Sequence, residues 1–342
     1  MLLLSQKFCW LSNLIAKPVM LLVGARHASP RATNLAIKPL SNCRSIVFIA
    51  LSIILALVTD VQASEKAPGA FAQTVSGARP VVLGEAYTAM ADDANAIWWN
   101  PAGISQLRES LFTSTYANLY NVDGLSMSSL GFAAPTDMGA FGAGITYLRA
   151  SDIPITDSTG NLIKLSIQSE EVLTLSYGNS LLDKLHLGAG IRYLHSGQVI
   201  DYSGLSLDFG LLANPIKRFC FGATLQQMAS YITSGDGKES RKLPRNVKIA
   251  AIFGTERIST GLGLSNLSSS HYREISAGCE VVTCNYITLR AGLQTGMQSE
   301  ATTSWGAGIG FRLERIQIDY SYMNQTSLAS SHLISITISI TK

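Results

Sequence analysis

Apolar and polar residues alternate one by one along most of the chain from residue 109 onward. Within 185–195, leucine, isoleucine and tyrosine alternate with histidine, glycine and arginine. Within 332–341, isoleucine alternates with serine and threonine. Side chains two positions apart lie on the same face of a strand. The pattern therefore predicts a series of β-strands, each with one apolar and one polar face.

Fourteen segments carry this alternation, an even number, as single-chain bacterial membrane barrels require. Many of them are about nine to eleven residues long, which suits a tilted membrane-spanning strand. They lie at 110–120, 125–134, 139–149, 170–178, 185–195, 205–213, 219–228, 245–254, 258–266, 273–281, 286–294, 303–312, 315–323 and 332–341.

Alternation alone does not tell which face points outward, because a soluble barrel or sandwich has the same pattern with its apolar face inside. The polar faces here carry His, Arg, Lys, Asp and Gln, which suit a wet lumen, whereas the opposite faces carry bulky aliphatics and tyrosines, which suit lipid. Short turns alternate with longer loops, such as those at 150–169 and 229–244. We therefore expect an all-β fold, a transmembrane antiparallel β-barrel formed by residues 109–342.

The stretch from 77 to 103 breaks the alternation. It combines a small-residue turn, one short helical run, the acidic pair Asp92 and Asp93, two adjacent tryptophans and the sequence Asn-Pro-Ala-Gly at its end. Pro fixes φ and Gly permits turns, so this last sequence predicts a corner leading into the first strand. We interpret residues 64–108 as a hatch segment that lies inside or beneath the barrel.

Some residues of the hatch are candidates for contacting a ligand or for moving when a path opens. They are Trp98, Trp99, Asn100, Pro101 and Gly103. For the tryptophans, the alternatives are packing against the barrel wall or an apolar contact for a ligand. For the other three, the alternatives are a fixed corner or a mobile one.

A second group of candidates consists of polar residues on the faces assigned to the lumen. They are His186, Arg192, Lys248, Arg290, Arg315 and Asp319. Barrel interiors commonly hold such side chains in hydrogen-bonded networks, and a role in selectivity is the alternative for each.

Catalytic and metal-binding motifs are absent from the sequence. It has no GxSxG, HExxH or Walker pattern. Asp92, Asp93 and Asn95 lack the glycine and the distal glutamate of a calcium-binding EF-hand loop, so capping and turn formation is the better interpretation. We expect no enzyme activity, no metal and no cofactor.

The N-terminal part carries an export pattern. An apolar run at 46–58 follows Arg44 and ends in small residues before Ser64, which predicts a secretory signal peptide, with a retained membrane anchor as the alternative. Residues 1–45 are either a mis-assigned start or an extended leader. The leader, 1–63, holds the excess of basic residues, and the remaining chain is slightly acidic. Nucleic acid is therefore not an expected partner.

The segments 78–103, 181–197, 207–228 and 305–324 together resemble the PorV/PorQ family, which is related to the FadL-type outer-membrane transporters. The resemblance implies a fourteen-strand barrel with an N-terminal hatch in the outer membrane of a Gram-negative-type bacterium. Two features depart from it: Val-Leu-Gly-Glu stands where Gly-Met-Gly-Gly is usual before the helix, and the chain ends on lysine instead of an aromatic residue.

Two functions follow from this resemblance. The first is binding hydrophobic small molecules or passing them across the outer membrane, which predicts an apolar cavity behind Trp98 and Trp99. The second is a shuttle or scaffold that binds exported proteins or a secretion-system component in type IX secretion. That function predicts a plugged lumen and a binding surface on the outer loops. Outer-membrane lipid is an expected partner in both cases.

Overall fold

The computed structural model describes residues 76–156, 162–166, 168–198, 201–238, 240–255, 257–268, 273–297, 302–326 and 328–340. The predicted leader at 1–63 and the first part of the predicted hatch, 64–75, lie outside these residues. No helix among the described residues is long and apolar enough to cross a membrane.

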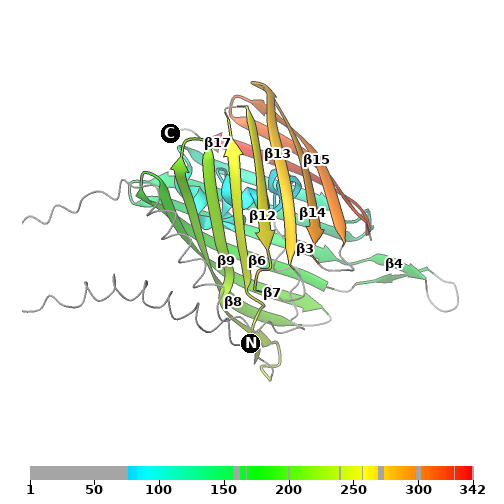
Figure 1. Cartoon of the computed structure of the whole chain (residues 1–342). Coiled ribbons are helices and arrows are strands. Elements are labelled where there is room, and N and C mark those ends of the chain that lie inside the picture. The colour runs from blue at the N-terminus through cyan, green and yellow to red at the C-terminus, as the bar shows by residue number, and fades with distance from the viewer. Residues whose placement is uncertain are drawn as a thin grey trace, which may run out of the picture. The chain divides into compact units, whose positions relative to one another are not determined.

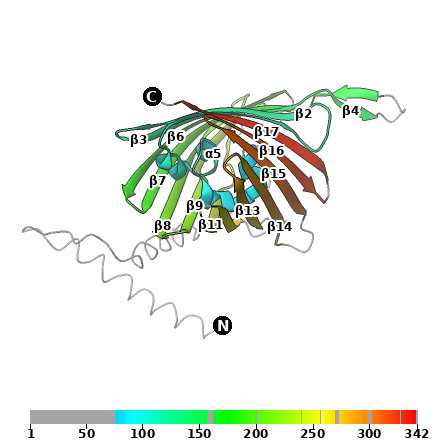
Figure 2. The same ribbon diagram turned by 90° about the horizontal axis from the view of Figure 1, so that it is seen from above.

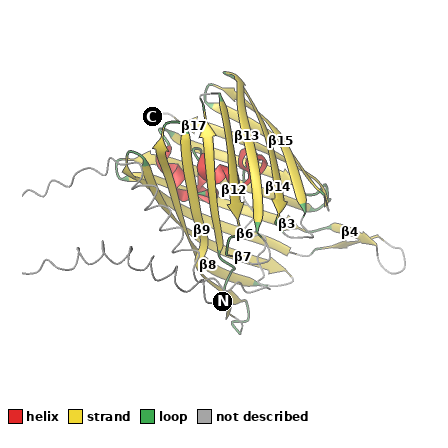
Figure 3. Ribbon diagram, in the orientation of Figure 1, coloured by secondary structure: helices red, strands yellow, loops and turns green. Residues whose placement is uncertain are grey.

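Fourteen strands form one antiparallel sheet that closes on itself (Figures 1 and 3), which confirms the predicted fold class. Each strand pairs with its neighbours in sequence, and the ring closes where β1 pairs with β17. The strands are β1 (Ser110–Asn118), β2 (Leu125–Thr136), β3 (Gly139–Ala150), β6 (Gln168–Leu182), β7 (Leu185–Gln198), β8 (Tyr202–Ile216), β9 (Phe219–Ser234), β11 (Asn246–Gly254), β12 (Ile258–Ser265), β13 (Glu274–Cys284), β14 (Ile287–Gly296), β15 (Thr303–Leu313), β16 (Ile316–Gln325) and β17 (Leu328–Ile340).

Strands β6 to β9 are longer than the alternation predicts, and the predicted loops at 150–169 and 229–244 are correspondingly shorter. Pairing continues to the register Gln168↔Gln198 between β6 and β7. The reason is that backbone hydrogen bonding persists where the side-chain pattern weakens. The loop after β3 also contains a hairpin of its own, β4 (Ile153–Thr156) with β5 (Leu162–Leu165), and β10 (Ser240–Arg241) extends the edge of β9.

The outer face of the barrel is apolar. Along β3, buried and exposed residues alternate, and the large side chains Phe141, Ile145 and Tyr147 are exposed. The same holds for Ile334 and Ile336 on β17. A belt of exposed aliphatic and aromatic residues is the surface that a barrel presents to lipid.

The two ends of the barrel differ. At one end, which we call the short-turn end, neighbouring strands are joined by tight connections such as 183–184, 217–218 and 314–315. The chain also enters β1 and leaves β17 at this end. The opposite, long-loop end carries the connections that hold β4, β5 and β10. In outer-membrane barrels, short turns face the periplasm and long loops face outward.

Residues 76–107, here called the hatch, lie inside the ring of strands (Figure 2). In place of the one helical run predicted, the hatch has five short helices. They are α3 (Ala78–Leu83), η2 (Gly84–Ala86), α4 (Tyr87–Met90), α5 (Ala96–Trp99) and η3 (Pro101–Gln106). Gly84 has φ 59°, which interrupts the first run, and the extended Asn100 separates the last two helices. The chain can thereby turn repeatedly within the narrow lumen.

Candidate functional site

The hatch separates two cavities in the lumen. The outer cavity, of about 310 Å³, lies toward the long-loop end and has Val81, Glu85 and Trp99 among its lining residues. The lower cavity, of about 690 Å³, lies toward the short-turn end and is lined in part by Arg79 and Asp92. Residues of this one short segment therefore line both cavities.

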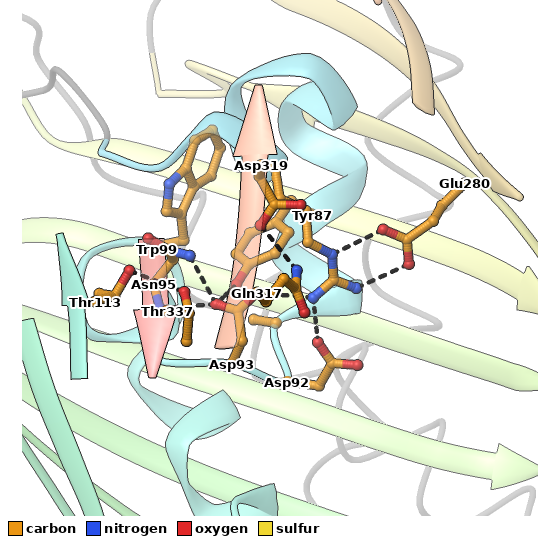
Figure 4. Close-up of polar contacts among 12 residues, drawn as sticks. Tyr87, Asp92, Asp93, Asn95, Trp99, Thr113, Glu280, Gln317, Asp319 and Thr337 are labelled. Atoms are coloured by element: carbon orange, nitrogen blue, oxygen red, sulfur yellow. Dashed lines mark hydrogen bonds and ion pairs between the residues drawn. The ribbon is translucent and has the colours of Figure 1, made fainter. Parts of the chain in front are cut away.

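An ion network attaches the start of the hatch to the barrel wall, as Figure 4 shows. The Arg79 guanidinium contacts Asp92 at 2.5 Å, Asp93 at 2.8 Å and Glu280 of β13 at 2.8 Å. Arg290 of β14 then binds Glu280 at 2.6 Å and Asp319 of β16 at 2.6 Å. We call this network the ionic latch; its members are Arg79, Asp92, Asp93, Glu280, Arg290 and Asp319.

Arg79 and Asp93 stabilise each other's charges within the hatch part of the latch. Burial opposes ionisation of Asp93, but the Arg79 charge and hydrogen bonds from Tyr87, Arg79 and Asn95 outweigh it, so the pKa of Asp93 is lowered. Burial also opposes the charge on Arg79, yet Asp92, Glu280 and Asp93 hold its pKa well above the ordinary value. Burial of Tyr87 raises its pKa most, and the negative charge of Asp93 raises it further. Asp93 is thus a carboxylate and Tyr87 a neutral donor at neutral pH, whereas burial raises the pKa of Asp92.

A second ion pair holds the hatch below the outer cavity. Lys248 of β11 lies 3.1 Å from Glu85 and is only 2% exposed. Its ammonium group also lies 4.9 Å from the centre of the Trp99 ring, a cation–π distance. Trp99 in turn donates to the Ser76 carbonyl at 2.9 Å and packs edge-on against Tyr87.

Trp98 and Trp99, which the sequence treats together, have different surroundings. Trp99 lines the outer cavity. Trp98 does not line either of the two cavities; its ring fills the space that Gly131 of β2 and Gly144 of β3 leave open. A Cβ atom at Gly144 would lie 2.5 Å from that ring. Of the two tryptophans, the geometry therefore favours Trp99 for contacting a ligand and Trp98 for packing.

The main chain around Trp98 is fixed by polar groups from the wall. The Trp98 carbonyl accepts hydrogen bonds from Arg192 of β7 at 2.7 Å and from Gln226 of β9 at 3.1 Å. Arg192 is itself paired with Asp208 of β8 at 2.5 Å. Beside this group β9 has an irregular register with β8, and Gln227 has φ 58° and donates its backbone N–H to Asp208 at 2.9 Å.

The Asn-Pro-Ala-Gly sequence begins a helix instead of leading directly into β1. The Asn100 side chain accepts from the Ala102 N–H at 3.2 Å and donates to the Thr88 carbonyl at 2.8 Å. The turn that follows lies directly on glycines of the wall: a Cβ atom at Gly188 would collide with the backbone of Pro101 and Ala102.

The predicted lumen residues fall into two groups. His186, Arg192, Lys248, Arg290 and Asp319 are buried. Four of these five belong to the ion pairs described above, and His186 hydrogen-bonds Ser105 of the hatch at 2.9 Å. Arg315 differs: it is exposed in the two-residue turn between β15 and β16, at the edge of the lower cavity. The reason is that β16 begins one residue later than the alternation predicts.

Sequence reasoning missed Arg79, Glu85 and Glu280. Arg79 and Glu85 are isolated charges in a stretch of small and apolar residues. Such isolation is itself a signal that each is buried beside a partner of opposite charge elsewhere in the chain. Glu280 falls on the inward face of β13 by the period of two, together with Ser276.

Solved structures that share this fold include two described as toluene transporters. The P. putida toluene transporter TodX is 12% identical, with 73% of this chain and 94% of that chain covered and a TM-score of 0.54. The Ralstonia pickettii toluene transporter TbuX is 14% identical, with 75% and 98% covered and a TM-score of 0.52. A Pseudomonas aeruginosa FadL homologue is 12% identical, with 74% and 95% covered and a TM-score of 0.52. No family model matches the sequence, and no curated protein matches it. At this identity the likeness shows the FadL-like fold alone.

Proposed function

We propose that this protein is an outer-membrane barrel, exported by a cleaved signal peptide, that binds hydrophobic small molecules and passes them toward the periplasm. The observation that carries the proposal is the position of the hatch in the lumen, with residues that line the cavity on either side of it. The described toluene transporters TodX and TbuX, which share the fold, support the chemical class. The closer kinship with the PorV/PorQ family is part of this proposal.

A ligand enters at the long-loop end and occupies the outer cavity. One side of that cavity is apolar, formed by Leu119, Met127 and Leu333, with Trp99 at the hatch. Burial of an apolar ligand there is favourable by roughly 25 cal/mol for each Å² removed from water. The cavity volume of about 310 Å³ is at the lower end of the range for small-molecule sites.

Passage beyond the outer cavity requires the start of the hatch to leave the wall formed by β13 to β16. The ionic latch and the Lys248–Glu85 pair oppose this movement. Separating buried charges leaves them unpaired in a region of low dielectric, which is costly. The closed state is therefore the resting state, and opening is a transient event.

Locking the hatch with a disulfide tests the proposal. A Cβ atom at Gly261 of β12 would lie 3.2 Å from the Ala86 Cβ, close to the roughly 3.5–4.5 Å of natural disulfides. We expect Ala86→Cys combined with Gly261→Cys, in a chain with Cys220, Cys279 and Cys284 replaced by serine, to stop uptake when oxidised. Uptake of radiolabelled toluene by cells that carry the barrel in their outer membrane is the measurement.

Each single cysteine variant is the matched control and should be insensitive to oxidation. Adding a reductant should restore uptake by the double variant. Equal uptake by the oxidised and reduced double variant would contradict transport past the hatch.

The alternative, a scaffold in type IX secretion, predicts a plugged lumen and a binding surface on the outer loops. The partly apolar cavity beside Trp99 supports the transport hypothesis, which predicts such a cavity.

A further inference from the structure

The outer cavity has a polar side as well as an apolar one. Opposite Leu119, Met127 and Leu333, its lining includes Glu274 at the start of β13 and Lys248 of β11. A ligand with an apolar body and a polar group would match both surfaces.

The charge on the polar side is negative. The charged residues lining the outer cavity are Glu85, Lys248 and Glu274. The positive charge of Lys248 is neutralised by Glu85 at 3.1 Å, and the lysine is only 2% exposed. Glu274, in contrast, is exposed and receives a long hydrogen bond from Ser265 at 3.4 Å. The charge that a ligand meets is thus the Glu274 carboxylate.

Further acceptors lie in the same lining. Glu85 Oε2 and Gln325 Oε1 are buried and have no hydrogen-bond partner in the described part of the chain. Because these two atoms are fully buried, a ligand reaches them only if their side chains turn toward the cavity, and the exposed Glu274 carboxylate is the acceptor that it meets first. Among the described residues, the lining has no cation without a carboxylate partner to bind an anion.

We propose that the outer cavity selects small amphiphiles with an aromatic or short aliphatic body and a primary amine, and discriminates against carboxylates of the same size. An ammonium group donates three hydrogen bonds and pairs with the Glu274 carboxylate. A ligand carboxylate would instead lose its hydration next to a like charge. This inference names the substrate class of the proposed transport function and rests on it.

Four probes of matched shape test the selection: phenethylamine, phenethyl alcohol, ethylbenzene and phenylacetate. Binding to the purified full-length barrel in nanodiscs of zwitterionic lipid is measured by calorimetry, with empty nanodiscs subtracted. We expect phenethylamine to bind about tenfold tighter than phenylacetate, which corresponds to one charge-assisted hydrogen bond. The affinities of phenethyl alcohol and ethylbenzene should lie between those of phenethylamine and phenylacetate.

Two variants at one position sharpen the test. Glu274→Gln keeps the size of the side chain and should reduce the preference for the amine to about twofold. Glu274→Lys should reverse it in favour of phenylacetate. Asp123→Asn, which removes an exposed carboxylate in the turn before β2 at the same end of the barrel but outside the cavity lining, should leave the preference unchanged. Heat-modifiable migration on a gel confirms that each variant is folded.

The outcomes separate this inference from the proposed function. If ethylbenzene binds and phenylacetate binds as tightly as the amine, the charge selection is wrong while hydrophobic binding stands. If none of the four probes binds the folded barrel, the proposed function itself fails.

Discussion

The two halves of the hatch are held in different ways. The first half, residues 76–93, carries Arg79, Glu85 and two aspartates and packs against β9 and β11 to β17. The second half, residues 94–107, contains no charged residue and packs against β2, β3 and β6 to β8. Both halves lie with their backbone against wall glycines, as at Val82 beside Gly292 and at Pro101 beside Gly188, but only the first half is also held by ion pairs.

This difference indicates which half moves. Ion pairs can exchange their partners for water or for other ions once a segment begins to separate, and protonation weakens them. The second half has no charged residue, so its attachment, which includes the contact of Pro101 and Ala102 with Gly188, cannot be weakened in this way. We infer that the first half is the mobile part of the hatch and that the second half is its fixed attachment.

The largest effect is expected at the fixed half. Gly188→Ala places a Cβ atom against the backbone of Pro101 and Ala102, which cannot rotate away as a side chain would. We expect a loss of about 3 kcal/mol in the free energy of unfolding, at the upper end for overpacked interiors. Thermal unfolding of the barrel in detergent is the measurement.

Gly197→Ala, in the same strand, is its matched control, because the nearest atom to the added Cβ is His195 Nε2 at 3.9 Å. Equal stability of the two variants would show that the close contact does not fix the second half.

A smaller effect is expected from the ionic latch. Arg79→Gln removes the cation that Asp93 and Glu280 share, at a cost of about 2 kcal/mol, the scale of a hydrogen bond to a charged group. Hydrogen exchange should increase at the amides of 78–93 but not at those of 96–106.

Arg149→Gln provides the comparison, since its pair with Asp152 is 53% exposed on both sides. Exposed pairs contribute about 0–1 kcal/mol, so exchange in the hatch should stay unchanged. A uniform increase along the whole hatch in Arg79→Gln would overturn the distinction between its halves.

Acidification should give the smallest effect. The pKa of Asp93 is lowered in the folded barrel, so its contribution to stability is complete above the ordinary aspartate pKa of about 3.9. It is lost as the pH falls through the lower folded value. We expect the thermal unfolding temperature to fall as the pH is lowered from about 4 toward 3, and to fall less in Asp93→Asn. An Asp93→Asn variant with an unchanged acid dependence would exclude Asp93 as the titrating group.

The strand pattern could be predicted because it is local. Each of the fourteen segments carries its own period of two, and all fourteen are strands in the structure. The same period placed Arg192, Lys248 and Asp319 inside the barrel before their partners were known. The period of two predicted the wrong boundary at strand ends such as Arg315 and at the ends of β6 and β9. There the boundary is decided by hydrogen bonding with the neighbouring strand and not by side-chain character.

The partners of the hatch could not be predicted in this way. Arg79 and Glu280 are separated by 201 positions, and no pattern within either segment indicates their contact. Likewise the different surroundings of Trp98 and Trp99 depend on Gly131, Gly144 and Lys248, which come from three different strands.

The sequence by itself thus determined the fourteen strands, the apolar and the polar face of each, and the presence of a segment unlike the strands, because each follows from spacing within a few neighbouring residues. The tertiary structure alone decided that this segment lies in the lumen between two cavities, and which charges hold it there. Closing the barrel brings together residues distant in the chain, and their burial and pairing depend on that closure.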